Sequence, residues 1–437
     1  MKIIDSAEFD AYWRTVRMQE EDEAVIAAVR EVIAGVRQRG GAAVREFAAR
    51  FDRSAPENPE VPLETAEAAY RVLKDNEPEL AESLEFAARN IREFAERQRA
   101  QFIDFEFEIA PGLFTGQRVI PVERAGIYAP GGRFPLVSSV LMGIIPALAA
   151  GVGEVILASP PGAEGLPDRR ILAAAYLAGA RRIFALGGAQ AVAALALGAG
   201  TIPRVDVIAG PGNKYVAAAK GLLFGEVGID FIAGPTDVLI IADGQDPGLE
   251  AAPEDLIAAD LLAQAEHDPD ARARALFPSR DMAGRIAAAV EKQLAVLPTA
   301  AAARASLDAG GLIVICTSRE EAARIANVIA PEHLELQVEA PDSWIPLLRN
   351  YGSLFVGSRA AEVLGDYSAG INHTLPTSGS ARFSAGLSVR HFLKTPTSLR
   401  CGPGPGFDAA RLAAERIAAA EGLAGHAAAA AARVQLT

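Results

Sequence analysis

The sequence predicts an α/β protein with two doubly wound, Rossmann-like units, a helical N-terminal region and a small helical tail domain at the C-terminus. From residue 124 onward, short runs rich in Val, Ile and Ala alternate with helical segments, which is typical of parallel sheets. Several runs end in glycine-rich loops, and such loops gather at the carboxyl edge of a parallel sheet. A nucleotide could bind at that edge.

The opening third of the chain is expected to be mostly helical. The apolar spacing predicts one helix from residue 23 and a second after Gly40, ending near Asp52. A longer helical pattern fills residues 64–101. No residue pattern in this third points to chemistry.

The first α/β unit should contain five strands, at 124–130, 154–159, 182–186, 205–210 and 229–234. Its loops are Tyr128-Ala-Pro-Gly-Gly132, Gly187-Gly-Ala-Gln190, Gly210-Pro-Gly-Asn213 and Ala233-Gly-Pro-Thr236-Asp237. One such loop would be no more than a tight turn, but four in register favour a ligand site. The dinucleotide fingerprint G-x-G-x-x-G does not follow the early strands, so a standard phosphate turn is not predicted.

A second strand set lies at 238–243, 311–316 and 352–357. The first unit is therefore expected as an insertion, residues 123–236, within a larger unit formed by residues 1–122 and 237–377. Residues 378–437 would form the tail domain, which includes an Ala-rich helix over 408–421.

Composition narrows the function classes. The formal net charge is −13, which makes a nucleic-acid surface improbable and favours small-molecule partners. The two cysteines, Cys316 and Cys401, form neither a disulfide framework nor a metal-type pair, and this fits a reducing cytoplasm. Twenty uncharged residues, 134–153, are long enough to span a membrane, but their prolines, serines and glycines favour a buried loop and helix.

One stretch combines a helical pattern with metal-capable side chains. Pro253 suits a helix start, and Gln264 and His267, three residues apart, would project from the same face. Taken alone, such a pair more often caps a helix or faces solvent. The chain has only five histidines, however, and several lie in polar clusters beside carboxylates, which suggests a site.

Ordered motifs make the chain similar to the histidinol dehydrogenase family over nearly its whole length. The matching stretches are GIYAPGG, SSVLMGIIPA, GGAQAVAAL, GPGNKYVAAAK, DLLAQAEH, PEHLEL, GDYSAGINHTLPT, ARFSAGLSV and AEGLAGH. The resemblance implies an aldehyde dehydrogenase-like arrangement of the two units, with residues 123–236 binding NAD. It also implies a zinc-dependent homodimer that oxidises a primary alcohol through an aldehyde to a carboxylate.

By resemblance, one Zn²⁺ per site would be held by Gln264, His267, Asp366 and His426. Two histidines with oxygen donors suit a borderline cation such as zinc. Glu332 and His333 match the catalytic pair. A histidine that titrates near neutrality suits the base that takes the alcohol proton, and the adjacent carboxylate would activate water for the second oxidation. For an isolated pair, a surface loop after Pro331 would be the simpler interpretation.

The resemblance also places cofactor and substrate contacts. The cofactor contacts would be Tyr128, Gln190 and Asn213, and the substrate contacts would be Thr236, Gln264, His267, His333, Asp366, Glu421 and His426. A carboxylate at Glu421 suits a cationic amine or imidazole, although a solvated acid on an Ala-rich helix is an equally good interpretation. Glu421 and His426 are expected to come from the partner chain.

The chain departs from the family pattern at a few positions. Thr236-Asp237 stands where the family typically has Ser-Glu, Arg133 follows the Pro-Gly-Gly turn, and Phe392-Leu-Lys394-Thr395 is off pattern. These features resemble those of sulfopropanediol dehydrogenases, relatives that oxidise a sulfonated diol. A guanidinium at Arg133 would suit such an anionic substrate. A solvated loop residue is the competing interpretation of Arg133.

Two hypotheses of different classes remain from the sequence. The first is a zinc- and NAD-dependent alcohol-to-acid dehydrogenase, with L-histidinol or an anionic diol such as 2,3-dihydroxypropane-1-sulfonate as substrate. The second is a non-catalytic relative that binds a metal or small ligand. The intact catalytic pair and ligand positions favour the enzyme.

Overall fold

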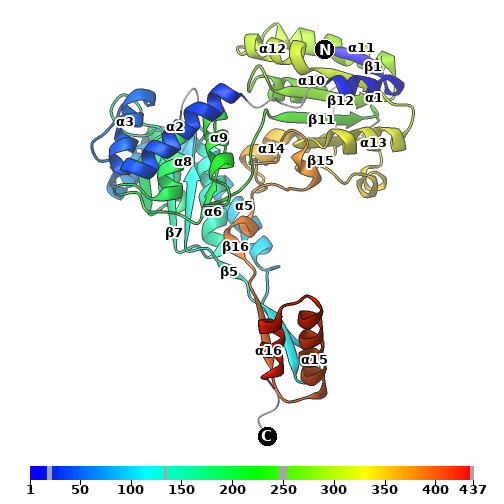
Figure 1. Cartoon of the computed structure of the whole chain (residues 1–437). Helices are drawn as coiled ribbons and strands as arrows, with labels where there is room; N and C mark the ends of the chain where they lie inside the picture. Colours follow the sequence, from blue (N-terminus) through cyan, green and yellow to red (C-terminus); the bar gives the residue numbers. More distant parts are fainter. Residues whose placement is uncertain (17–21, 132–134, 246–252, 434–437) are drawn as a thin grey trace.

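The computed structural model of the 437-residue chain describes residues 1–16, 22–131, 135–245 and 253–433. It has a mixed α/β fold with two six-stranded, mainly parallel sheets and a C-terminal arm that projects away from both (Figure 1). Each sheet has helices on both faces, because the helices form separate hydrophobic cores against its two sides.

The first sheet has the strand order β10-β9-β6-β7-β8-β2, and only β2 runs antiparallel to its neighbour. Its strands are β2 (Glu60–Val61), β6 (Arg124–Tyr128), β7 (Glu154–Ser159), β8 (Arg182–Ala185), β9 (Val207–Ala209) and β10 (Gly228–Ile229). One face is covered by α2 (Glu23–Arg39), α3 (Gly41–Phe51), α8 (Gly188–Leu197) and α9 (Lys214–Leu223). The other face is covered by α4 (Leu63–Asn76), α5 (Pro78–Arg99), α6 (Val137–Ala150) and α7 (Arg169–Ala178).

The second sheet has the order β1-β13-β12-β11-β14-β15, with every neighbouring pair parallel. Its strands are β1 (Lys2–Asp5), β11 (Asp237–Ala242), β12 (Arg272–Phe277), β13 (Leu312–Ile315), β14 (His333–Gln337) and β15 (Ser353–Val356). One face packs against α10 (Pro253–Ala265), α11 (Arg280–Leu294) and α12 (Ala300–Gly310). The other packs against α1 (Ser6–Thr15) and α13 (Arg319–Ile329), while α14 (Glu362–Tyr367) follows β15.

The C-terminal arm joins two distant parts of the chain. Its antiparallel sheet has the order β17-β4-β3, made of β3 (Phe105–Ala110), β4 (Leu113–Gln117) and β17 (Thr397–Cys401), and it carries α15 (Pro405–Ala420) and α16 (Ala424–Ala431). The pair β5 (Ile120–Pro121) and β16 (Leu393–Lys394) links the arm to the body. Short 3₁₀ turns lie at Pro341–Ser343, Ile345–Leu347, Ser380–Arg382 and Val389–Phe392.

These contacts correct the expected grouping of residues 1–122 with 237–377. Only β1 and α1 lie with the second sheet, whereas α2 to α5 pack against the first sheet and β3 and β4 belong to the arm. The expected tail, 378–437, is therefore completed by strands from near residue 110. Sequence periodicity records that a helix has a buried face, but it does not record which sheet buries it.

Two segments that were expected to be helical contain helices in the structure. The pattern over 64–101 is two helices, because Pro78 lacks a backbone N–H and Glu77 before it leaves the helical conformation, with φ −136°. The uncharged stretch contains α6, a buried helix that packs against α5 and α7. Among the described residues, no helix is both long and apolar enough to cross a membrane.

Candidate active site

Glu332 and His333 lie at the amino end of β14, beside the start of β11. His333 is the first residue of β14, and it pairs in register with Val238 of the neighbouring strand. Both side chains are buried, with 5% and 3% exposure, so the pair does not lie on a surface loop. In the first sheet, by contrast, the loops expected to bind a ligand follow β6, β8 and β9 and therefore lie at the carboxyl ends of the strands.

The carboxylate of Glu332 is held through one oxygen. Its Oε2 accepts hydrogen bonds from Thr236 Oγ1 at 2.5 Å and from the backbone N–H of Asp237 at 3.1 Å. Burial raises the pKa of Glu332 to about 7, although His333 and the Thr236 hydroxyl oppose this. Both hydrogen bonds fall on Oε2, so Oε1 is the oxygen available to a water.

The imidazole of His333 lies among carboxylates. Nε2 is 3.2 Å from Oδ1 of Asp366, and Nδ1 is 3.3 Å from the carbonyl oxygen of Asp237. Burial by itself would lower the pKa of His333, but Glu332, Asp366 and Glu362 together raise it well above its ordinary value. The ring is therefore fixed at both nitrogens.

Two buried acids, Glu335 and Glu362, and the half-buried Asp260 form a second layer behind His333. Oε2 of Glu362 is 3.8 Å from Nδ1 of His333, and the backbone N–H of Glu362 donates to Glu335. Gln337 bridges Glu335 and Asp260 through Nε2. Burial raises the pKa of Glu362 to about 8 and that of Glu335 well above its ordinary value, so the layer favours protonated carboxyls over further negative charge.

Three of the four expected metal ligands come from the second unit. Gln264, at the end of α10, is buried and donates from Nε2 to Thr236 Oγ1 at 2.8 Å, so its Oε1 is the atom that can bind a cation. His267 follows the helix and is exposed, and its charge would act on Asp366 of α14. An amide oxygen, an imidazole and a carboxylate fit zinc by donor chemistry.

The fourth expected ligand lies elsewhere in the same chain. His426, on α16, and Glu421, after α15, are exposed on the arm, well away from α14 (Figure 1). Within the part of the chain that the structure describes, no group of three His, Cys, Asp or Glu side chains could hold a metal ion. A single chain therefore does not bring the whole expected ligand set together.

The expected cofactor residues gather at the carboxyl edge of the first sheet. Tyr128, at the end of β6, accepts a hydrogen bond from the backbone N–H of Gly188 at 3.2 Å, and Gln190 lies in the first turn of α8. Asn213 caps α9, where its Oδ1 accepts from Tyr215 N and Val216 N. Tyr128 and Gln190 are buried, with 3% and 1% exposure, whereas Asn213 is exposed, so of these three residues Asn213 is the one that a ligand can reach in this chain.

Several residues at the site were not anticipated. Asp52, at the end of α3, accepts from Gln190 Nε2 at 3.1 Å and from the backbone N–H of Gly187. Arg274, in the middle of β12, forms a buried ion pair with Asp237. Alternating polar and apolar residues in β12 and β14 were the only sequence signal for these strands, and such alternation ordinarily predicts a half-exposed strand.

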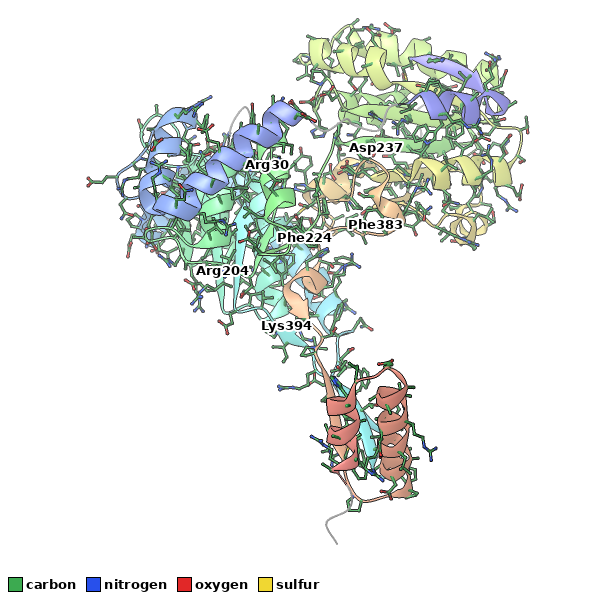
Figure 2. The ribbon with its side chains drawn as sticks, viewed as in Figure 1. Arg30, Arg204, Phe224, Asp237, Phe383 and Lys394 are labelled. Atoms are coloured by element: carbon green, nitrogen blue, oxygen red, sulfur yellow. The ribbon has the colours of Figure 1, made fainter. Side chains whose placement is uncertain are left out.

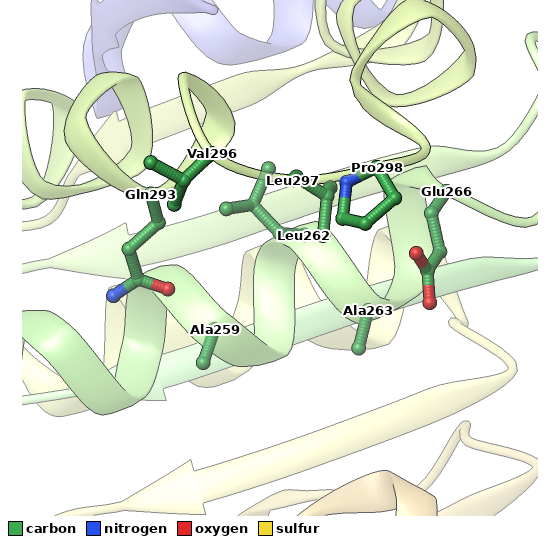
Figure 3. A pocket seen from close by; sticks show the side chains of 8 residues that line it. All are labelled: Ala259, Leu262, Ala263, Glu266, Gln293, Val296, Leu297 and Pro298. Carbon is green, nitrogen blue, oxygen red and sulfur yellow. The ribbon is translucent and has the colours of Figure 1, made fainter.

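Of the positions singled out from the sequence, Phe392 does not line the site. Phe392 is fully buried in a core against the first sheet, and Arg133 lies outside the described residues. A surface hollow of about 350 Å³ is lined by α10 and the segment after α11, including Ala259, Ala263 and Val296 (Figure 3). Ala259 lies on a different face of α10 from Asp260 and Gln264, so the hollow does not coincide with these two side chains.

Comparison with known proteins gives consistent similarity over the whole chain. Residues 15–434 match the family model described as histidinol dehydrogenase. The histidinol dehydrogenase of Methylococcus capsulatus is 45% identical over 413 residues, covering 94% of this chain and 92% of the relative, and that of Parasynechococcus marenigrum is 43% identical over 414 residues, covering 95% and 92%. The crystal structure of histidinol dehydrogenase from Elizabethkingia anophelis superposes with a TM-score of 0.88 at 33% identity, covering 99% of this chain and 97% of that one.

Proposed function

Because the chain belongs to the histidinol dehydrogenase family of oxidoreductases, we propose that it oxidises L-histidinol through the aldehyde to L-histidine. The family supports an oxidoreductase, and the buried Glu332–His333 pair is the observation that carries the two-step reaction. Each step removes two electrons and two hydrogens, and the second also adds the oxygen of one water. Bound NAD⁺ would accept the hydride in each step, and bound Zn²⁺ would anchor and polarise the substrate.

In the first oxidation, His333 takes the hydroxyl proton as the hydride leaves. Its ring is fixed by Asp237 and Asp366, which orients Nε2 toward the same carboxylate that the zinc site uses. When Asp366 binds a cation, its negative charge is offset, which favours the neutral imidazole that a base requires.

In the second oxidation, Glu332 activates the water that adds to the aldehyde. With a pKa of about 7, a substantial fraction of Glu332 is deprotonated near neutral pH, and this carboxylate is more basic than an ordinary one. Thr236 and Asp237 occupy Oε2, so the orientation of Oε1 is set before substrate arrives. The adjacent His333 and Glu332 therefore divide the two proton transfers between them.

We also propose that the enzyme is a homodimer in which Glu421 and His426 complete the partner's site. The arm that carries them projects from the body, and β3 exposes Phe105, Phe107 and Ile109 to 49%, 52% and 57%. A row of exposed apolar side chains on a protruding arm suits burial against a second subunit. Helices on both faces of each sheet support the doubly wound, Rossmann-like description.

The test is NADH formation by the zinc-loaded protein with L-histidinol and, separately, with 2,3-dihydroxypropane-1-sulfonate. We expect two NADH for each L-histidinol consumed, and loss of this activity in His333→Ala. Turnover of only the sulfonate would overturn the histidinol assignment and direct attention to Arg133. Zinc binding without NADH from any alcohol would instead support a non-catalytic relative.

A further inference from the structure

A buried ion pair lies directly beneath the catalytic carboxylate. Nη1 of Arg274 on β12 is 3.0 Å from Oδ2 of Asp237 on β11, and the two side chains are only 6% and 7% exposed. The guanidinium also lies over the ring of Trp13 in α1, 5.1 Å from its centroid. Asp237 lies within the second unit near its boundary with the first (Figure 2).

Asp237 makes a reciprocal pair of hydrogen bonds with Glu332. Its backbone N–H donates to Oε2 of Glu332 at 3.1 Å, and its Oδ1 accepts from the backbone N–H of Glu332 at 3.0 Å. Arg274 occupies the other carboxylate oxygen, Oδ2. One aspartate therefore joins the arginine to both the backbone and the carboxylate of Glu332.

A pair of this kind needs a reason to be buried. Removing an arginine and an aspartate from water costs several kcal/mol per ion, and apolar residues at the same positions are often as stabilising. The two strands are already joined by a parallel ladder from Asp237 to Ile241, so the pair is not required to align them. What the ion pair adds to this ladder is the link from Arg274 through Asp237 to Glu332.

We propose that Arg274 and Asp237 are positioning residues that hold Glu332 for water activation, the second step of the proposed function. Arg274 fixes the rotamer of Asp237, and Asp237 fixes the backbone and Oε2 of Glu332. Arg274 acts on Glu332 through Asp237, to which its Nη1 donates. The proposal therefore assigns this pair mainly to the oxidation of the aldehyde.

The charges around Glu332 predict that replacing Arg274 and replacing Asp237 shift the pKa of Glu332 in opposite directions. The groups that act on it are His333 on β14, Asp237 and the Thr236 hydroxyl at the start of β11, and Glu362 on α14. The negative charge of Asp237 raises the pKa of Glu332, and Arg274 offsets that charge. Arg274→Met should raise this pKa, whereas Asp237→Asn should lower it.

The experiment measures the aldehyde-to-acid step and the alcohol-to-aldehyde step separately against pH, using zinc-loaded full-length protein. For the aldehyde step, we expect the acidic limb to move up by about one pH unit in Arg274→Met and down in Asp237→Asn, as expected for loss of one nearby charge. The double variant should return toward the wild type, because it removes both opposite charges, while the amide introduced by Asp237→Asn keeps an oxygen for the backbone N–H of Glu332. The alcohol step should change less in every variant.

Controls separate this role from general stability. Arg285→Met removes a solvent-exposed arginine of α11 that pairs with Glu254, and it should leave both limbs in place. Arg274→Lys should restore part of the aldehyde rate lost in Arg274→Met. If Arg274→Met does not fold, the proposal is tested by whether the acidic limb of the aldehyde step moves to lower pH in Asp237→Asn. Equal loss of both steps, or shifts of the same sign, would overturn the proposal. Wild-type protein that forms no NADH from histidinol would overturn the proposed function itself.

Discussion

Oδ1 of Asp366 lies 3.2 Å from Nε2 of His333, so an expected metal ligand and the proposed base share one contact. Asp366 lies on α14 and His333 begins β14, and the two are brought together from 33 residues apart. The metal site and the catalytic pair are therefore expected to respond to each other.

Asp366→Asn should weaken zinc binding and abolish NADH formation from L-histidinol. We expect zinc affinity to fall by roughly 100-fold or more, because even partners outside the ligand set are worth 10- to 100-fold. Metal content after dialysis, measured alongside activity, checks this. Asp342→Asn, which changes an exposed acid in a 3₁₀ turn, is the control and should retain zinc. Full zinc content in Asp366→Asn would exclude Asp366 as a ligand.

Glu332→Gln should separate the two oxidations. Loss of a general base costs about 10²- to 10⁴-fold, so the aldehyde step should slow by that factor and the NADH yield per histidinol should fall from two toward one. In the wild type the aldehyde step should rise with pH through about 7, as Glu332 loses its proton, and this rise should be absent in the variant. A variant that still yields two NADH at the wild-type rate would assign water activation elsewhere.

Mixed dimers test whether one site uses two chains. His333→Ala and His426→Ala should each be inactive alone, because every site then lacks one residue. Unfolding and refolding them together should restore activity at about a quarter of the sites, since each mixed dimer has one intact site. His333→Ala mixed with Glu332→Gln is the control, because both residues come from the same chain and no site becomes intact. Equal behaviour of the two mixtures would show that sites are not shared.

Gly210→Ala should weaken NAD binding. Gly210 has φ +119°, and an added Cβ would lie 2.1 Å from the carbonyl oxygen of Tyr128, so the loop between two expected cofactor contacts must move. We expect strain of roughly 1–3 kcal/mol and a higher dissociation constant for NAD⁺, measured by calorimetry. Gly284→Ala, in helix α11 with open space around the new Cβ, should instead stabilise the fold by about 0.5–1 kcal/mol. Unchanged NAD⁺ affinity in Gly210→Ala would dissociate this loop from the cofactor.

Lys220→Met should lower the free energy of unfolding. Lys220 is buried, pairs with Asp230, and donates to the carbonyl of Gly210 at 3.0 Å. Its loss leaves a buried carboxylate unpaired, at a cost of about 3–5 kcal/mol in chemical denaturation. Lys292→Met, at an exposed position of α11, should change stability by less than about 0.5 kcal/mol. A similar small change in Lys220→Met would mean that the pair is not stabilising.

Three strands of the first sheet were predicted from their first residue because each begins a short apolar run, whereas β2 was not predicted and the strand expected at 229–234 overlaps β10 only at Ile229. β6, β7 and β8 begin at the predicted residues, and the helices α2 and α3 also follow the pattern. β12 and β14 were missed because their buried faces carry Arg274 and Glu335. Such residues look exposed in a sequence, since only partners far along the chain offset the cost of burying them.

The sequence by itself determined the α/β class, the starts of β6, β7 and β8 and the identities of the side chains with chemistry, because these follow from local periodicity and residue type. Tertiary structure alone decided that α2 to α5 cover the first sheet, that Arg274 pairs with Asp237, and that His426 lies on an arm remote from Asp366 in its own chain. Each of these depends on contacts between residues distant in sequence. Local periodicity specifies that a face is buried, whereas the packing of whole elements specifies what buries it.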